Sequence, residues 1–145
     1  MNAAFKRIEN GDNAVAVVET VKTLFAEVQQ IVASIDPELA KLDGYQLIYQ
    51  AFDGAEERKK EGKVIPERPP KIKLNTLGNE SEWSEQKGFR DLGCGAASAI
   101  RNPISHTSVD LDFVRRRFGK RYTALKFLCL LSLLFEKLEN RVAPR

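Results

Sequence analysis

Residues 12–34 read DNAVAVVETVKTLFAEVQQIVAS, and this stretch decides the fold class. Apolar residues recur in it at three- and four-residue spacings, which is the period of an amphipathic helix. Asp12 is a suitable N-cap for that helix. The positions expected to face the core are Val15, Val18, Val21, Leu24, Phe25, Val28, Ile31 and Val32. The stretch therefore predicts a long helix with one buried face.

Three other stretches carry helix start signals. Asp36 precedes a proline, while Asp43 and Asn79 precede a glutamine and a glutamate by three residues. These pairs suit an N-cap with proline at the first helical position, or a capping box. They predict a second start at Asp36, a short helix after Asp43 and a longer one after Asn79. The apolar positions of the longer helix are Trp83, Phe89, Leu92, Ala96, Ala99 and Ile100.

That longer helix contains a stretch of unusually small residues, GFRDLGCGAA at 88–97. A glycine inside a helix costs roughly 1 kcal/mol relative to alanine. We expect the close approach of another backbone to offset this cost. A break in the helix near Gly93 is the alternative.

A last helix is expected from Asp110 or Asp112 to about Asn140, with a bend at Gly119. Its inward positions are Phe118, Tyr122, Leu125, Leu128, Leu131, Phe135 and Leu138. Residues 127–135 are apolar nearly all round, which is typical of a helix buried on more than one side, in a bundle centre or a dimer interface.

Residues 54–79 differ in composition from the rest. They combine glycines, prolines and a charge run at 56–60, which break regular structure. We expect a long irregular loop there. Ile72 and Leu74 alternate with lysines and suit one short extended piece, but no strand pair is evident.

The whole chain suits a single domain, 1–145, with a sizeable core. It is 43% hydrophobic and 30% charged, as in an ordinary globular protein. Four to five helices with short connections predict an all-α antiparallel bundle. Cys94 and Cys129 lack metal or redox spacing and are expected as reduced core residues. Because no signal peptide or bilayer-length apolar run is evident, we expect a cytoplasmic protein without membrane contact.

The candidate chemistry lies in RNPISH at 101–106, which holds the single histidine. Pro103 has no amide hydrogen for the preceding turn, so the helix is expected to kink or stop there. Such a break lets His106 fold back beside Arg101, although on a straight helix the two would point about 140° apart. Asn102 is placed to hydrogen-bond the imidazole and set its tautomer. Ser105 adjoins the histidine as a supporting hydrogen-bond donor.

An arginine beside a histidine suits phosphate chemistry. Imidazole takes or gives a proton near neutral pH. Guanidinium binds phosphate oxygens at two points and stabilises developing charge. RNA supplies its own nucleophile, the 2′-hydroxyl, so this hypothesis needs no metal and no cofactor. The sequence has no Gly-rich phosphate loop, no HExxH and no cysteine cluster with metal spacing.

A basic cluster follows the motif. Its members are Arg115, Arg116, Arg117, Lys120 and Arg121. It is a candidate RNA-binding surface, since each phosphate contact adds salt-sensitive affinity. A solvated helix face is the alternative. Trp83 and Phe89 are able to stack on bases, but a place in the core is favoured for both.

The stretch 101–106 resembles the Arg-x4–6-His motif of HEPN domains, in which a polar residue follows the arginine. More narrowly, the chain resembles the Ymh-type HEPN-like family of bacterial and phage proteins. That family combines an N-terminal amphipathic helix, a "dG..L" turn, a "G...L..Ga..aiRNP.aH" segment and a leucine-rich final helix. The matching stretches here are 15–32, DGYQL at 43–47, GFRDLGCGAASAIRNPISH at 88–106, and 125–138. Ser105 stands where the narrower pattern often has alanine.

The resemblance implies a HEPN-like bundle that pairs into a two-fold dimer, with two motifs facing each other across a cleft. It implies metal-independent cleavage of RNA, with Arg101 on the scissile phosphate, His106 as base or acid, and Asn102 orienting them. It also implies a toxin or anti-phage defence component, with an antitoxin or regulatory protein as a further partner. Two alternatives stay open. One is a non-catalytic helical dimer that binds RNA, a nucleotide or a protein, and the other is a structural role in which His106 caps a helix end.

Overall fold

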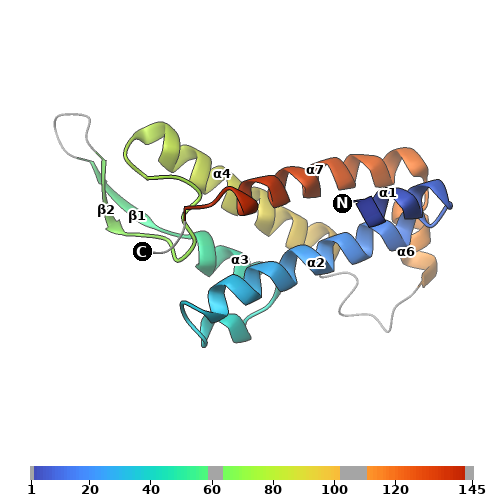
Figure 1. Cartoon of the computed structure of the whole chain (residues 1–145), viewed down its shortest axis with the longest axis horizontal. Helices are drawn as coiled ribbons and strands as arrows, with labels where there is room; N and C mark the ends of the chain where they lie inside the picture. Colours follow the sequence, from blue (N-terminus) through green and yellow to red (C-terminus); the bar gives the residue numbers. More distant parts are fainter. Residues whose placement is uncertain (1, 59–63, 102–110, 143–145) are drawn as a thin grey trace.

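The computed structural model describes residues 2–58, 64–101 and 111–142, and this part of the chain is mostly helical. It contains six α-helices, one 3₁₀ turn, one π-helical segment and a two-stranded sheet (Figure 1). In chain order the elements are α1 (Asn2–Glu9), α2 (Asn13–Ala33), η1 (Leu39–Lys41), α3 (Gly44–Phe52), β1 (Ala55–Arg58), β2 (Val64–Arg68), α4 (Glu80–Ala96), η2 (Ala97–Arg101), α6 (Leu111–Phe118) and α7 (Arg121–Glu139).

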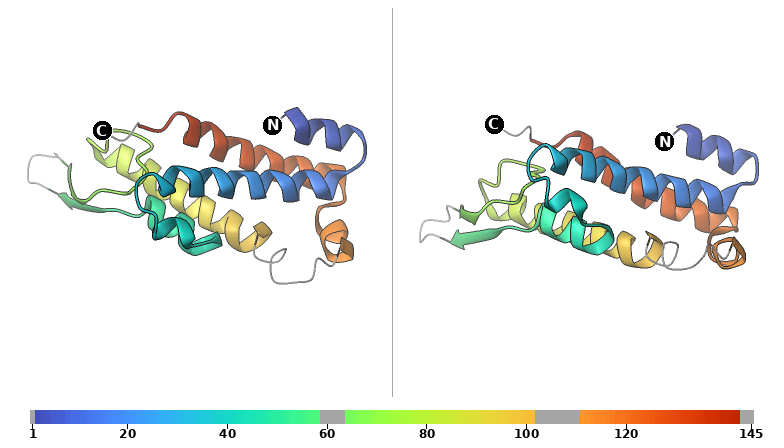
Figure 2. Two further views of the ribbon diagram at one scale, coloured as in Figure 1. Left: turned by 60° about the horizontal axis from the view of Figure 1, so that its bottom comes forward. Right: turned by 90° about the horizontal axis from the view of Figure 1, so that it is seen from below.

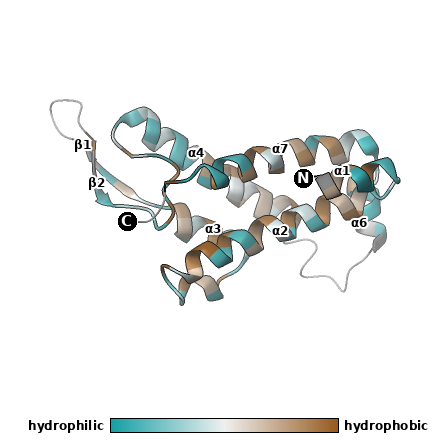
Figure 3. Cartoon of the chain, in the orientation of Figure 1, coloured by the Kyte–Doolittle hydropathy of each residue, from teal (hydrophilic) through white to brown (hydrophobic). Residues whose placement is uncertain are grey.

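The two longest helices, α2 and α7, pack against each other and form the centre of the molecule (Figure 2). α1 folds back along α2, while α3 and α4 pack together on the other side of α2. Hydrophobic residues concentrate on α2 and α3, whereas the start of α4 is hydrophilic (Figure 3). Fully buried core residues include Val17, Val21, Val32, Leu47, Ala51, Leu128, Leu131, Leu134 and Leu138. The predicted helical class is confirmed, with six α-helices where four to five were expected.

The bounds of α2 agree with the sequence pattern, but its buried face is rotated slightly from the expected one. Val15 is 39% exposed, while Ala14, Ala16 and Val17 are buried. The sequence pattern did not predict α1, and α1 packs on the first turns of α2 beside small residues such as Ala16. The expectation that Val15 faces the core was therefore wrong.

Residues 54–79 hold an antiparallel β-hairpin, so the prediction of a loop without a strand pair was wrong. β1 pairs with β2, and the register shifts between Ala55 and Glu56. The apolar pair Ile72 and Leu74 lies outside the strands and is buried against the helices. The backbone amide of Ile72 donates to the carbonyl of Ala51 at 2.9 Å, which ties this segment to the end of α3.

The expected last helix is divided into α6 and α7. The break falls at Gly119, where a bend was predicted. The amide of Gly119 donates to the Arg115 carbonyl at 2.7 Å, and a Cβ at this glycine would lie 2.3 Å from that oxygen. Two inward predictions were wrong, because Tyr122 is 71% exposed and Cys129 is also exposed. No helix in the described ranges is both long and apolar enough to span a bilayer.

Candidate functional site

The helix that leads into the RNPISH motif, α4, has a side-chain cap at its start and packs closely against α3 farther along. At its start, the Asn79 side chain accepts from the Glu82 amide at 3.0 Å and donates to the Glu82 carboxylate at 3.1 Å, as the capping pattern predicted. Further along, a Cβ at Gly93 would lie 2.8 Å from Cγ2 of Ile48 in α3. The small residue thus permits the close approach of helices that the sequence predicted, and the helix does not break there.

After Ala96 the helix widens into the π-helical segment η2. Ala97 and Ile100 are completely buried, and η2 contacts both α2 and α3. Short π segments inside α-helices are rare and recur at functional sites. The sequence predicted a kink or stop at Pro103, and the departure from α-helical geometry begins before it, at Ala97.

Arg101 is the last residue of η2. Asn102, Pro103, Ser105 and His106 lie outside the described residues. The expected juxtaposition of arginine, asparagine and histidine therefore stays a prediction, and the structure contributes the position of the helix end from which it starts.

The basic cluster lies on the surface. Arg115, Arg116 and Arg117 are exposed on α6, and Lys120 and Arg121 are exposed at the junction with α7. Val114 and Phe118, on the other side of α6, are buried. The Asn13 side chain donates to the Gly119 carbonyl at 2.7 Å and fastens this junction to the start of α2. The cluster therefore presents cationic side chains from a surface that is anchored to the core.

A second group of exposed side chains was not anticipated from the sequence. Tyr45 and Tyr49 of α3 are stacked, with ring centroids 5.8 Å apart and an interplanar angle of 9°. The Arg90 guanidinium of α4 lies over the Tyr49 ring, 5.2 Å from its centroid. The available signal was the four-residue spacing of two tyrosines in GYQLIYQAF at 44–52, because residues at that spacing share a helix face.

Arg90 is held in place by two carboxylates. It contacts Asp53 at 2.6 Å and Asp91 at 2.9 Å. Burial alone would lower the pKa of Arg90, but the hydrogen bonds to Asp91 and Asp53 outweigh it and raise the pKa. Asp53 also accepts from Arg68 at 2.5 Å. Burial tends to raise the pKa of Asp53, and its two arginine hydrogen bonds lower it overall. Both groups are therefore charged at neutral pH.

Trp83 and Phe89, the aromatic residues considered for base stacking, are core residues as favoured. Trp83 is 1% exposed and its indole donates to the Leu77 carbonyl at 3.1 Å. Phe89 packs against Phe52 with ring centroids 4.7 Å apart.

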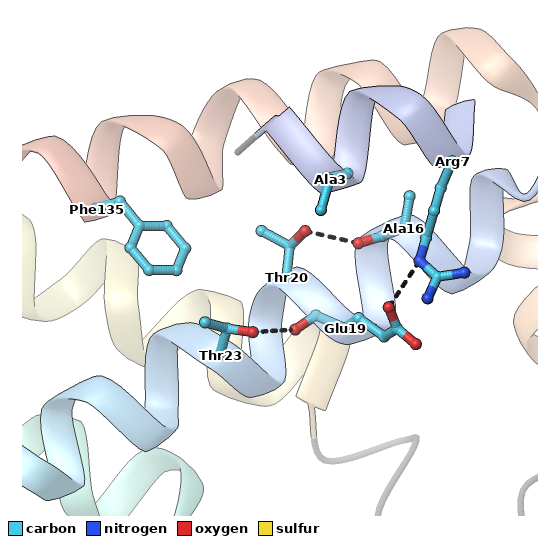
Figure 4. A pocket seen from close by; sticks show the side chains of 8 residues that line it. Ala3, Arg7, Ala16, Glu19, Thr20, Thr23 and Phe135 are labelled. Carbon is cyan, nitrogen blue, oxygen red and sulfur yellow. Dashed lines mark hydrogen bonds and ion pairs between the residues drawn. The ribbon is translucent and has the colours of Figure 1, made fainter. Parts of the chain in front are cut away.

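Two hollows on the described surface are also lined by exposed side chains. An open apolar groove runs between α4 and α7 and includes Leu92 and Leu133, each 44% exposed. Leu92 was expected in the core, and that prediction was wrong. A second hollow lies between α1, α2 and α7 (Figure 4). There Arg7 pairs with Glu19 at 2.8 Å, and the Thr20 hydroxyl donates to the carbonyl of Ala16.

The fold and the described part of the site define a mostly helical protein in which a long helix ends in a π turn at the start of an Arg-Asn-Pro sequence. A family model described as a protein of unknown function, Hypoth_ymh, matches residues 1–138. The chain therefore belongs to the Hypoth_Ymh family. No curated protein and no solved structure matches it. Among the described residues, no group of three His, Cys, Asp or Glu side chains is arranged to hold a metal ion.

Proposed function

We propose that this protein is a metal-independent endoribonuclease of the HEPN type that works as a homodimer. The observation that carries the proposal is the position of Arg101 at the end of an anchored π turn, directly before Asn102 and five residues before His106. Because Ala97 and Ile100 are buried in the core, packing fixes the π-helical backbone that ends at Arg101.

The reaction follows from the two side chains. The His106 imidazole accepts the proton of the RNA 2′-hydroxyl, and the 2′ oxygen attacks the adjacent phosphorus. The bond from phosphorus to the 5′ oxygen breaks, and a protonated imidazole returns a proton to that oxygen. Arg101 binds the phosphate oxygens and stabilises the charge that develops on them, while Asn102 orients the imidazole. The products are a cyclic 2′,3′-phosphate and a 5′-hydroxyl.

The exposed arginine cluster at the α6–α7 junction supports RNA as the substrate. It follows the motif along the chain, and it offers cationic groups to a phosphate backbone without a metal ion. In the cell, such an activity suits a toxin or an anti-phage defence component that an antitoxin or a regulatory protein holds in check. Ser105 would support the imidazole by a hydrogen bond.

An RNA digest in EDTA tests the proposal. The wild type is expected to cut single-stranded RNA, and Arg101→Ala and His106→Ala are each expected to lose at least about a hundredfold in rate. Arg7→Ala is the matched control, because Arg7 makes one half-exposed ion pair with Glu19. A wild type that leaves RNA intact, or motif variants that cut as fast as the control, would refute the proposal.

The exposed basic cluster also favours a second candidate, a non-catalytic dimer that binds RNA. In that case RNA binding survives His106→Ala and falls when Arg115, Arg116 and Arg117 are neutralised. Titrating labelled RNA and measuring product formation with the wild type and both variants separates the two candidates. The nuclease forms product, and His106→Ala abolishes product formation while RNA binding persists. The non-catalytic dimer binds RNA and forms no product in any of the three proteins.

A further inference from the structure

The Tyr45–Tyr49 stack is a pair of exposed aromatic rings whose planes are nearly parallel. Its members contact one another in the order Arg90, Tyr49, Tyr45. Tyr45 ends this series and is 41% exposed, compared with 37% for Tyr49 and 18% for the Arg90 side chain. One end of the stack is thus held by the protein and the other meets solvent.

The stack lies beside the part of α4 that leads into η2. α3 packs against the second half of α4, so Tyr49 lies beside Arg90, and the Tyr45 carbonyl lies 3.9 Å from Sγ of Cys94. Tyr45 is therefore the member nearest η2. From Cys94 to Arg101 the helix advances seven residues, or roughly 10 Å. In both views of Figure 2, α3, the end of α4 and α6 follow one another along one edge of the molecule.

The exposed surface of α3 is aromatic and uncharged, which favours some classes of ligand over others. The sequence GYQLIYQAF contains no charged residue, and Gln46 and Gln50 are exposed beside the tyrosines, with 3.5 Å between their amide groups. Flat aromatic rings and neutral amides suit nucleobases, which stack and form hydrogen bonds with their edges. The cationic groups that a phosphate backbone needs lie at the other end of the same edge, on α6.

We propose that the Tyr45–Tyr49 stack is a nucleobase platform that holds single-stranded RNA near the end of η2 at Arg101. Tyr45 stacks on one base, and Arg90, held by Asp53 and Asp91, keeps Tyr49 in place behind it. The arginine cluster on α6 then holds the phosphates farther along the same edge. This inference rests on the proposed ribonuclease function and specifies how the substrate strand is placed.

Fluorescence anisotropy with a short, labelled 2′-O-methyl RNA of mixed sequence tests the platform, because this RNA binds but lacks the attacking hydroxyl. Tyr45→Ala is expected to weaken binding by about fivefold to a hundredfold, the effect of one base stack. Tyr45→Phe keeps the aromatic face and is expected to bind within about twofold of wild type. Phe5→Ala is the matched control, because Phe5 is 44% exposed and belongs to α1, which lies on the opposite side of the molecule from this edge (Figure 2).

Salt dependence provides a readout that a structural defect would not mimic. Stacking releases no counterions, so Tyr45→Ala is expected to leave the slope of log Kd against log salt unchanged, whereas Arg116→Ala lowers it by about one. The platform is overturned if Tyr45→Ala binds RNA like the Phe5→Ala control, if Tyr45→Phe weakens binding as much as alanine, or if Tyr45 is needed for a protein partner and not for RNA. If the wild type cuts RNA and Tyr45→Ala binds RNA as tightly as the wild type, only the platform is removed. A wild type that neither binds nor cuts RNA removes the ribonuclease proposal as well.

Discussion

Gln86 provides the sharpest test of how α3 and α4 are held together. Its side chain is 1% exposed and makes three hydrogen bonds to backbone groups. The amide nitrogen donates to the carbonyls of Phe52 at 3.1 Å and Ile72 at 2.9 Å. The amide oxygen accepts from the Leu74 amide at 3.0 Å. One side chain thus joins α4 to the end of α3 and to the segment after the hairpin.

Gln86→Met keeps the length of the side chain and removes all three bonds. A hydrogen bond contributes about 1 kcal/mol net, and a buried backbone group left without a partner costs about 1–3 kcal/mol. Allowing for partial relaxation, we expect the free energy of unfolding to fall by about 3–4 kcal/mol. For a chain of this length that lowers Tm by roughly 10–15 °C. Gln30→Met on the exposed surface of α2 is the control, with an expected change within about 0.5 kcal/mol.

Thermal and urea unfolding followed by circular dichroism measure both variants. A loss below about 1 kcal/mol for Gln86→Met would show that these bonds do not hold α3 to α4. Gln86→Glu adds a pH test of the same geometry. A carboxylate facing two carbonyls in a buried position has a raised pKa. The folded state then binds a proton more tightly than the unfolded state, so this variant should be more stable at pH 5 than at pH 7.

Two further substitutions test local packing and charge. Gly93→Ala should lower the free energy of unfolding by about 1 kcal/mol, because its new methyl group meets Ile48. Gly88→Ala has open space around it and should raise the free energy of unfolding by about 0.5–1 kcal/mol. Equal urea midpoints for the two variants would contradict this packing. Asp53→Asn should lower the free energy of unfolding by about 2 kcal/mol at pH 7, because it removes the ionised partner of two arginines. Since the pKa of Asp53 is lowered in the folded state, this contribution is fully present above about pH 4 and is lost as the pH falls through the lowered pKa. Unfolding measured at pH 7 and pH 3 checks the sign, because the cost should be smaller at pH 3.

Helix existence and capping were predictable from the sequence because they depend on local chemistry. Asn79 caps α4 as the spacing indicates, and the Glu82 carboxylate accepts from the Asn79 side chain and from the Gly78 amide. Asp43 caps α3 by accepting from the Gly44 amide at 2.7 Å. Asp12, in contrast, makes no capping bond through its side chain, and the start signal at Asp36 leads only to the 3₁₀ turn η1. The cap residues therefore predicted where these helices begin, but they did not predict how long each helix is.

The features that escaped prediction depend on contacts between distant segments. The hairpin was missed because β1 and β2 are charged and contain a proline, so their pairing is not visible as alternating hydrophobicity. Leu92 and Tyr122 have apolar or aromatic character that suits the core, yet the neighbouring helices leave both exposed. Arg90, which lies over the Tyr49 ring, belongs to another helix, and no local sequence pattern specifies that contact.

Contacts between distant segments also connect the end of η2, at Arg101, with the proposed platform on α3. The backbone that ends at Arg101 is held by the buried Ala97 and Ile100, and α3, which carries Tyr45, approaches α4 closely where Ile48 meets Gly93. Both depend on the α3–α4 interface, which Gln86 holds from the opposite end. If the protein is the ribonuclease proposed above, a substitution that shifts this interface should alter RNA placement and cleavage together. A substitution confined to Tyr45 should then weaken binding and leave cleavage of saturating RNA nearly unchanged.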